Sequence, residues 1–355
     1  NLKVDQFIDF RDAQVFEEAT NYTCLLFLSK PKKENYEFRF ATIKSKNVNL
    51  KEFISYLKDN IWRDIELEGS EYSLCTAENN VLQESGWKLI SKRHHKLMSK
   101  LEKNNVPLKK YIYKIFVGLQ ITPIEVFPVR IVEERDKYVF ISPIKPEKDG
   151  EVYEIEKDLL KPVLKSSDIE RYSFLHKNYY VIFPYKLGEK KGQEFEWSFI
   201  SESEMRKKYP KTFEYLKTKR HFLEEREKGR WKGSDRWYEY SRQQNFGCHQ
   251  SKKIITPGIS TEANYAIDEY GYYIDRGSYG ILIKEKENID PYFLLSLLNS
   301  KVLDFYLKMT APIISGGYYS YQTKYLENLP ICKATETQQK LLIQLVRRII
   351  VLKTL

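Results

Sequence analysis

One stretch of the chain combines basic and aromatic side chains in a pattern typical of nucleic-acid contact. Residues 206–253 contain fifteen lysines and arginines against six aspartates and glutamates, an excess of nine positive charges. Aromatic residues lie between the basic ones, among them Trp231, Trp237, Tyr238, Tyr240 and Phe246. Basic groups neutralise phosphates, while aromatic rings and guanidinium planes pack on sugars and bases. The stretch therefore predicts contact with a nucleic acid.

The alternative for this stretch is a solvated helix face followed by an ordinary core that contains two tryptophans. Both readings remain open at the level of sequence. If the stretch does bind, the residues expected to make contact are Arg230, Trp231, Arg236, Tyr238, Lys252 and Lys253.

The sequence carries none of the common catalytic or cofactor-binding signatures. No Gly-x-Gly occurs, and neither a dinucleotide fingerprint nor a P-loop is present. No Pro-Pro pair occurs either, which removes the Asn/Asp-Pro-Pro-aromatic motif of amino-group methyltransferases. The adjacent Cys248 and His249 stand alone, and we expect them to be structural. We therefore expect no catalytic centre, no cofactor site and no metal site in this chain.

The composition is that of a folded protein with a polyanionic partner. The 355 residues are 42% hydrophobic and 30% charged, and the formal net charge is +10. No apolar run approaches the roughly 20 residues of a membrane span, so no membrane partner is expected. Four widely spaced cysteines without a Cys-x-x-Cys pair favour a reducing cytoplasm. The first residue is Asn1 and no signal pattern follows, so we expect the chain to start inside a longer polypeptide.

The first residues predict the end of a domain. Residues 22–28 form a continuous apolar run, which predicts a strand buried on both faces. Such a strand needs a large sheet beside it, and about thirty residues are too few to build one. Residues 1–45 are therefore expected to be the last strands of a larger sheet. Helical spacing in residues 46–106 predicts a helical connector.

The rest of the chain predicts a domain of mixed α/β build over residues 107–335. Strand-like runs at 111–117, 138–141 and 179–183 are separated by charged turns, which is typical of a curved mixed sheet. Serines that can cap a helix precede helical spacing over 201–228. Residues 336–355 predict a terminal helix, and the overall fold class is α+β. In the terminal helix, five residues follow the 4-3-4-3 spacing of a coiled-coil seam: Gln338, Leu342, Leu345, Ile349 and Leu352.

Many short motifs of residues 107–355 resemble, in chain order, one known family. They include Gly118-Leu119-Gln120-Ile121-Thr122, Tyr180-Val181-Ile182-Phe183-Pro184-Tyr185, Lys252-Lys253-Ile254-Ile255-Thr256-Pro257, Leu297-Leu298-Asn299-Ser300 and Tyr325-Leu326-Glu327-Asn328-Leu329-Pro330-Ile331. Together they are similar to the TaqI-like C-terminal specificity domain. That domain is the DNA target-recognition part of type II and type IIG restriction-modification N6-adenine methyltransferases. The segment from Ile8 to Cys24 resembles the last conserved block of the methyltransferase domain.

The resemblance implies that this chain is a DNA-recognising fragment of a longer enzyme. The parent would bind S-adenosylmethionine, extrude an adenine from the duplex and methylate its N6 atom. A nuclease domain or subunit of the same system would be a further partner, and the fragment alone would be inactive. By resemblance, Phe16 would stack on the extruded adenine; the alternative is a phenylalanine of the core.

Two more groups of residues are candidates for DNA contact. Gln120 and Thr122 follow a strand, where an amide can read adenine in the major groove; the alternative is an amide that caps a turn. The segment Gly316, Gly317, Tyr318, Tyr319 and Tyr321 offers close backbone approach to phosphate, with tyrosines near sugar or base. The alternative there is a turn and strand with half-buried tyrosines. A function of a different class is a protein-interaction adaptor that uses the terminal helix and a basic surface.

Overall fold

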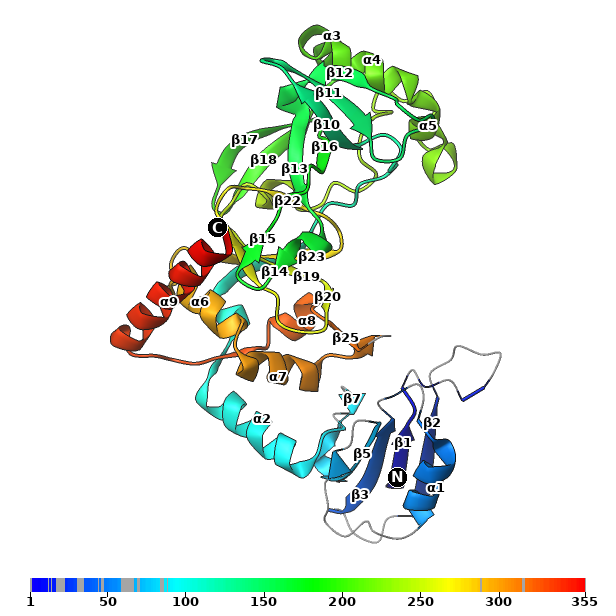
Figure 1. Cartoon of the computed structure of the whole chain (residues 1–355), viewed down its shortest axis with the longest axis vertical. Helices are drawn as coiled ribbons and strands as arrows, with labels where there is room; N and C mark the ends of the chain where they lie inside the picture. The colour runs from blue at the N-terminus through cyan, green and yellow to red at the C-terminus, as the bar shows by residue number, and fades with distance from the viewer. Residues whose placement is uncertain are drawn as a thin grey trace. The chain divides into compact units, whose positions relative to one another are not determined.

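The computed structural model describes residues 2–11, 13, 15–16, 23–30, 35–43, 45, 48–58, 67–68, 71–83, 86–87, 89–287, 289–314 and 317–354. The chain separates into two units. Unit 1 contains residues 1–105 and 305–318, and unit 2 contains residues 106–304 and 319–355. Helices and strands alternate irregularly in both units (Figure 1), which confirms the predicted α+β class.

Unit 1 is built on a five-stranded sheet with the order β2-β1-β3-β5-β4. Strand β1 runs antiparallel to β2 and parallel to β3. Phe53 of α1 is buried against Ile8, Ala41 and Leu74 of the sheet. The elements are β1 (Lys3–Asp9), β2 (Cys24–Ser29), β3 (Glu37–Ile43), α1 (Leu50–Lys58), β4 (Leu67–Glu68), β5 (Tyr72–Glu78), β6 (Leu82–Gln83), β7 (Gly86–Trp87) and α2 (Lys92–Asn104).

This region differs from the sequence expectations in two ways, although burial of residues 22–28 was expected in a larger sheet than the described one. Strand β2 lies at an edge of the sheet, and Leu25, Leu26, Phe27 and Leu28 are each between 42% and 49% exposed, not buried on both faces. An apolar run specifies strand structure, but burial depends on what packs against the strand.

The expected helical connector also contains strand structure. Strand β5 pairs along its whole length with β3, from Glu37 opposite Glu78 to Ile43 opposite Tyr72. The apolar residues of this segment therefore complete the sheet of unit 1, because cross-strand pairing overrides weak local helical spacing.

Unit 2 contains two sheets joined by crossing segments. The first sheet has the order β12-β11-β10-β16-β13-β22, and the second has the order β21-β19-β23-β9. The strands of the first are β10 (Pro128–Glu134), β11 (Tyr138–Pro143), β12 (Tyr153–Glu156), β13 (Leu160–Leu164), β16 (Tyr180–Ile182) and β22 (Tyr273–Ile274). Those of the second are β9 (Ile112–Val117), β19 (Lys253–Pro257), β21 (Ala266–Asp268) and β23 (Ser278–Ile283).

Short strand pairs and helices complete unit 2. The pairs are β14 (Ile169–Glu170) with β15 (Ser173–Phe174), β17 (Tyr185–Lys191) with β18 (Glu194–Phe199), β8 (Val106–Pro107) with β26 (Pro330–Ile331), and β20 (Ile259–Ser260) with β25 (Tyr318–Ser320). The helices are α3 (Glu202–Lys208), α4 (Pro210–Thr218), α5 (Arg220–Gly229), α6 (Pro291–Leu298), α8 (Thr323–Leu326) and α9 (Glu336–Thr354). Helix α7 (Lys301–Thr310) crosses the division between the units, and β24 (Ile313–Ile314) follows it.

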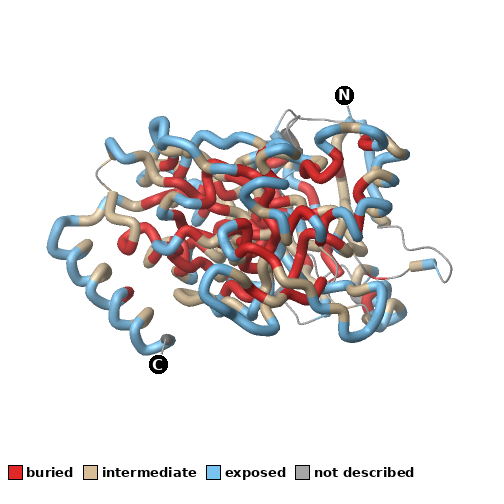
Figure 2. Tube along the Cα trace, turned by 90° about the horizontal axis from the view of Figure 1, so that it is seen from above, coloured by how far each residue is buried: buried red, intermediate tan, exposed pale blue. Residues whose placement is uncertain are grey.

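The terminal helix forms as predicted, but its buried face differs from the predicted seam. Helix α9 lies against α6, and most of its residues are exposed along the tube that ends at the C-terminus (Figure 2). Val346 is buried, while the seam residues Leu345 and Leu352 are exposed. A helix that packs on one neighbour at an angle does not keep a heptad seam.

The two sheets are held together at one close approach of the backbone. The amide of Leu119 donates to the carbonyl of Ile274 (2.8 Å), and the amide of Gly118 donates to that of Ser278 (3.1 Å). Leu119 and Asp275 form a parallel β-bridge. A Cβ atom on Gly118 would overlap the carbonyl oxygens of Ile274 and Asp275. Only glycine fits at position 118.

This geometry predicts that Gly118→Ala destabilises unit 2 by about 3 kcal/mol, because overpacking against rigid backbone forces the two sheets apart. Gly188→Ala is the matched control, since its Cβ would meet only the Cβ of Glu196 at 3.3 Å, and we expect a cost below about 1 kcal/mol. Urea unfolding curves of the two variants measure the difference. Equal stability of both would contradict the assignment of Gly118 as the point of closest approach.

Candidate nucleic-acid interface

The basic stretch 206–253 forms α3, α4, α5 and the turns that lead to β19. Ser201 caps α3 by accepting a hydrogen bond from the amide of Glu204 (3.4 Å), and Pro210 occupies the first turn of α4. Helical geometry ends at Arg226. Glu227, Lys228 and Gly229 follow with positive φ angles of 49°, 61° and 81°.

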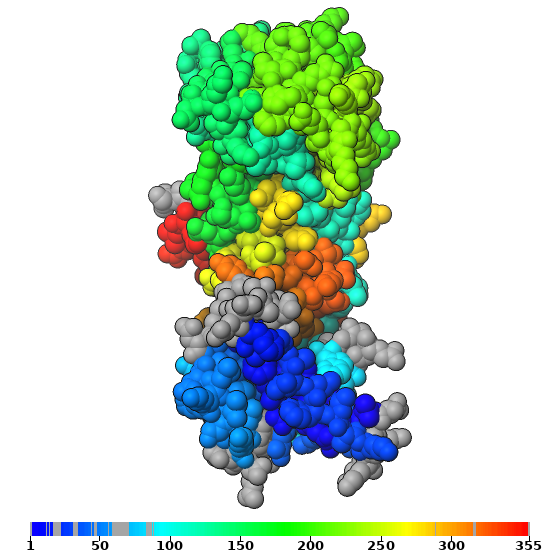
Figure 3. All heavy atoms as spheres, turned by 90° about the vertical axis from the view of Figure 1, so that its right-hand side faces the viewer, coloured from blue at the N-terminus to red at the C-terminus, as the bar shows by residue number. Residues whose placement is uncertain are grey.

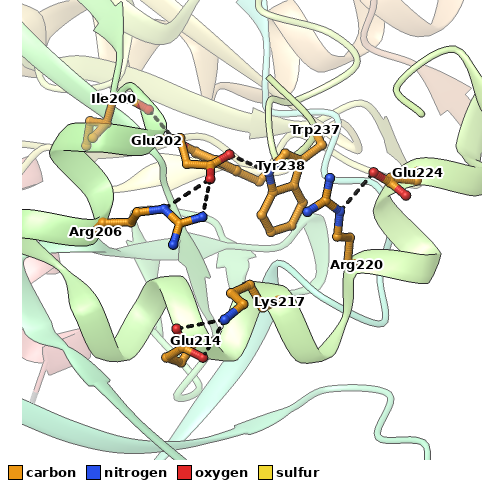
Figure 4. A network of polar contacts seen from close by, with 9 residues as sticks. All are labelled: Ile200, Glu202, Arg206, Glu214, Lys217, Arg220, Glu224, Trp237 and Tyr238. Atoms are coloured by element: carbon orange, nitrogen blue, oxygen red, sulfur yellow. Dashed lines mark hydrogen bonds and ion pairs between the residues drawn. The ribbon is translucent and has the colours of Figure 1, made fainter. Parts of the chain in front are cut away.

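Most of the charge of this stretch is neutralised within the fold. Ten of its fifteen basic side chains form ion pairs, and seven of the acidic partners come from other parts of the sequence. Figure 4 shows three of the pairs around Trp237, namely Arg206 with Glu202, Lys217 with Glu214, and Arg220 with Glu224. The others are Lys208–Glu204, Lys211–Glu154, Lys219 with Glu147 and Glu151, Arg230–Glu227, Arg236–Glu239, Lys252–Glu269 and Lys253–Asp268.

The aromatic residues of the stretch belong to the core. Trp237, Tyr238, Tyr240 and Phe246 are almost completely buried, and Trp231 is 8% exposed. The hydroxyl of Tyr238 donates to the carbonyl of Ile200 (2.7 Å), and the indole N–H of Trp237 donates to Glu202 (3.2 Å; Figure 4). The prediction of DNA contact through Trp231 and Tyr238 is therefore wrong in this fold, because side chains packed in the core cannot reach a duplex.

Lys253 is also buried, contrary to its predicted role in DNA contact. Its Nζ atom lies 2.5 Å from Oδ2 of Asp268, and both side chains are fully inaccessible to solvent. It donates to the carbonyl of His249 at the same distance. Burial lowers the pKa of Lys253, while the Asp268 carboxylate acts in the opposite direction. Lys252 precedes β19 and is exposed, whereas Lys253 is the first residue of this strand, which is buried at all five positions.

Three predicted basic residues keep exposed side chains. The side chain of Arg230 is 67% exposed, lies over the ring of Trp231 (5.3 Å) and pairs with Glu227 at 3.3 Å. Arg236 and Lys252 are exposed to a lesser degree and pair with Glu239 and Glu269. Lys228 and Lys232 beside Arg230 are exposed, and neither side chain makes an ion pair with any described residue.

The candidates of the C-terminal Gly-Gly segment differ in exposure. Gly316 lies outside the described residues. Gly317 has a φ of 77° with open space around it, and Tyr318 is exposed. Tyr319 is half-buried and pairs with Ser260 between β25 and β20. Tyr321 is buried, and its hydroxyl donates to Asp304 (3.3 Å), so direct DNA contact by Tyr321 is ruled out in this fold.

Phe16 is 59% exposed in unit 1. This exposure contradicts the alternative of a core phenylalanine within the described chain. Because phenylalanine gains stability from burial, an exposed ring is available for an external apolar or aromatic partner.

Gln120 and Thr122 lie on the crossing segment that follows Gly118, and both are half-buried. The bridge between Leu119 and Asp275 brings a further residue next to them, the exposed Arg276. On the face in Figure 3, teal atoms from the chain near residue 120 lie beside golden atoms from the chain near residue 275. The sequence analysis missed Arg276. The signal available was the turn sequence Asp275-Arg276-Gly277, which favours a tight, solvent-facing turn.

Within the described residues, no helix is both long and apolar enough to cross a membrane. The same residues do not gather three or more histidine, cysteine, aspartate or glutamate side chains into a group that could hold a metal ion.

Comparison with known proteins found a family model that matches part of this chain, most of it in unit 2. Residues 161–331 match the family model of the TaqI-like C-terminal specificity domain. The type II restriction enzyme and methyltransferase RM.Eco57I of Escherichia coli is 27% identical over 344 residues, which cover 93% of this chain and 32% of that protein. The type II methyltransferase M.BanIII of Aneurinibacillus aneurinilyticus is 31% identical over 144 residues, which cover 40% of this chain and 25% of that protein.

Among solved structures, the type IIG restriction endonuclease BpuSI aligns with a TM-score of 0.45 and 16% sequence identity, over 97% of this chain and 38% of that one. This chain therefore spans about a third or less of the length of the curated relatives that it matches.

The buried ion pair generates a prediction that separates two neighbouring lysines. Lys253→Ala leaves the Asp268 carboxylate buried without its partner and is expected to destabilise the fold by about 3–5 kcal/mol. Lys252→Ala removes an exposed pair and is expected to cost less than about 1 kcal/mol. Thermal unfolding of the two variants provides the measurement. Similar melting temperatures would show that Lys253 is not held in the interior.

Proposed function

We propose that this chain recognises the DNA target of a type II restriction-modification N6-adenine methyltransferase, because residues 161–331 match the family model of the TaqI-like C-terminal specificity domain. The family match carries this proposal, and the functions named for the two curated relatives support it. It is favoured over the adaptor hypothesis, since the terminal helix α9 already packs on α6.

The chain would act as one part of a longer enzyme. In that parent, a methyltransferase domain would transfer a methyl group from S-adenosylmethionine to an adenine extruded from the duplex. A nuclease, fused or separate, would cleave DNA that lacks the modification. DNA, cofactor and protein would meet in the cytoplasm, and the four free cysteines of this chain suit that reducing compartment.

The residues present in this chain do not fit S-adenosylmethionine. Gly-x-Gly turns and Pro-Pro pairs are absent from the sequence, so the chain lacks the backbone groups that would hold the cofactor and the target adenine. We therefore assign cofactor binding and catalysis to the remainder of the parent, and target recognition to unit 2.

In unit 2, the exposed loop 228–232 is the favoured phosphate-contacting part of the basic stretch. It presents Lys228, Arg230 and Lys232 to solvent, and of these three only Arg230 pairs with a carboxylate of a described residue. That surface pair is weak enough to exchange for a phosphate contact, because exposed ion pairs contribute at most about 1 kcal/mol.

The salt dependence of duplex binding tests this proposal. Charge reversal of Lys228, Arg230 and Lys232 to glutamate should weaken binding to all sequences and flatten the slope of log K against log salt by about three units, because three phosphate contacts are lost. Fluorescence anisotropy of a labelled duplex at several salt concentrations gives the slope.

The matched control reverses three exposed lysines outside this loop: Lys137, Lys148 and Lys286. It should leave most of the slope intact. Failure of the wild-type chain to bind duplex DNA at low salt would refute the proposed function itself, whereas equal slopes for the two triple variants would move the interface away from loop 228–232.

Phe16 provides a test in the longer parent protein. If its exposed ring stacks on the extruded adenine, the contact contributes about 1–3 kcal/mol, as for other base–aromatic stacking. Phe16→Ala should then lower the methylation rate by about one to two orders of magnitude. Phe16→Trp should retain much of the activity because it keeps an aromatic face. Extrusion can be followed with 2-aminopurine at the target position, and an unchanged signal in Phe16→Ala would contradict the stacking role.

A further inference from the structure

Two polar side chains near the crossing of the sheets in unit 2 have no polar partner among the residues that the structure describes. Arg276 is exposed and Gln120 is half-buried. Neither side chain makes a hydrogen bond, ion pair or ring contact with any described residue. This contrasts with the basic stretch, where ten of fifteen side chains are paired within the fold. A guanidinium and an amide without internal partners are available to an external ligand.

The backbone that carries Arg276 is held on both sides. The Asp275 carboxylate accepts from the amide of Gly277 (3.1 Å) and the hydroxyl of Ser278 (2.9 Å). The amide of Asp275 donates to the carbonyl of Leu164 (3.0 Å), and that of Gly258 donates to the carbonyl of Gly277 (2.7 Å). The carboxylate of the preceding residue is thus engaged by the turn, and Arg276 makes no ion pair with a described residue. A rigid base of this kind reduces the entropy lost when a side chain engages a ligand.

The parallel bridge sets the positions of the two side chains. Leu119 pairs with Asp275, and each chain continues by one residue to Gln120 and Arg276. Leu119 is buried, and because side chains alternate along extended chain, Gln120 lies on the opposite face. Each of the two polar residues thus directly follows one member of the bridge, on two segments that approach closely at Gly118.

We propose that Arg276 and Gln120 form a base-reading pair in the major groove, in which Arg276 recognises a guanine and Gln120 an adjacent adenine. The proposal rests on the proposed function and assigns sequence discrimination to two residues of unit 2. Guanine presents O6 and N7 to a guanidinium, and adenine presents N6 and N7 to a side-chain amide. A phosphate contact by Arg276 would use the same guanidinium but would carry no base preference.

The experiment selects duplexes from a randomised pool with the full chain of 355 residues and then measures affinities for the selected site and for its single-base variants. Arg276→Ala should reduce the preference for guanine at one position by about 10- to 100-fold. Gln120→Ala should relax the preference for adenine at a neighbouring position. Binding of both variants to unrelated duplexes should stay close to wild type.

Controls separate base reading from other effects. Neither side chain makes a hydrogen bond or ion pair with any described residue, so the melting temperatures should change little. Lys286→Ala, at another exposed cation of unit 2, should leave the base preferences intact. Uniform loss of affinity for all sequences in Arg276→Ala would identify a phosphate contact and overturn base reading. If the wild-type chain selects a site and both variants keep its base preferences, base reading by Arg276 and Gln120 is contradicted, whereas the proposed function is not. If the wild-type chain selects no sequence, the proposed function itself is contradicted, and the base-reading pair with it.

Discussion

The architecture of unit 2 depends on the approach of Gly118 to the carbonyl groups of Ile274 and Asp275. At this point the chain passes from β9 of the second sheet toward β10 of the first, and it meets the turn that returns from β22 to β23. These two connections between the sheets meet at a point where a side chain at position 118 has no room. The registers of β13 with β22 and of β9 with β23 follow from this shared anchor.

Around the first sheet of unit 2 and helices α3 to α5, the fold buries many aromatic rings that carry polar groups. The hydroxyls of Tyr215, Tyr238 and Tyr240 each donate to a backbone carbonyl at 2.6 to 2.7 Å. These bonds remove the cost of burying unpaired hydroxyls and fix the rings in one arrangement. The surrounding cations are paired with carboxylates from distant parts of the chain. Charge that is concentrated in sequence is therefore dispersed in space.

The sequence predicted local elements better than their surroundings. The strands near residues 112, 138 and 180, the cap at Ser201 and the terminal helix all follow from local patterns of side chains. The burial of Lys253, the exposure of β2 and the pairing of β5 with β3 do not, because each depends on contacts between residues far apart in sequence. For the candidate interface, the position of Gln120 was apparent, whereas Arg276 emerged only from the bridge that places it alongside.

The crossing at Gly118 also bears on how such a domain can change during evolution. Position 118 is sterically closed to substitution, yet the side chains of Gln120 and Arg276, which follow the bridge on its two strands, make no hydrogen bond or ion pair with a described residue. Mutations at these two positions are nearly free of a stability cost, and mutations at the glycine are not. The amino acids at positions 120 and 276 can therefore change during evolution while Gly118 is retained, so that differences between related domains accumulate beside an unchanged glycine.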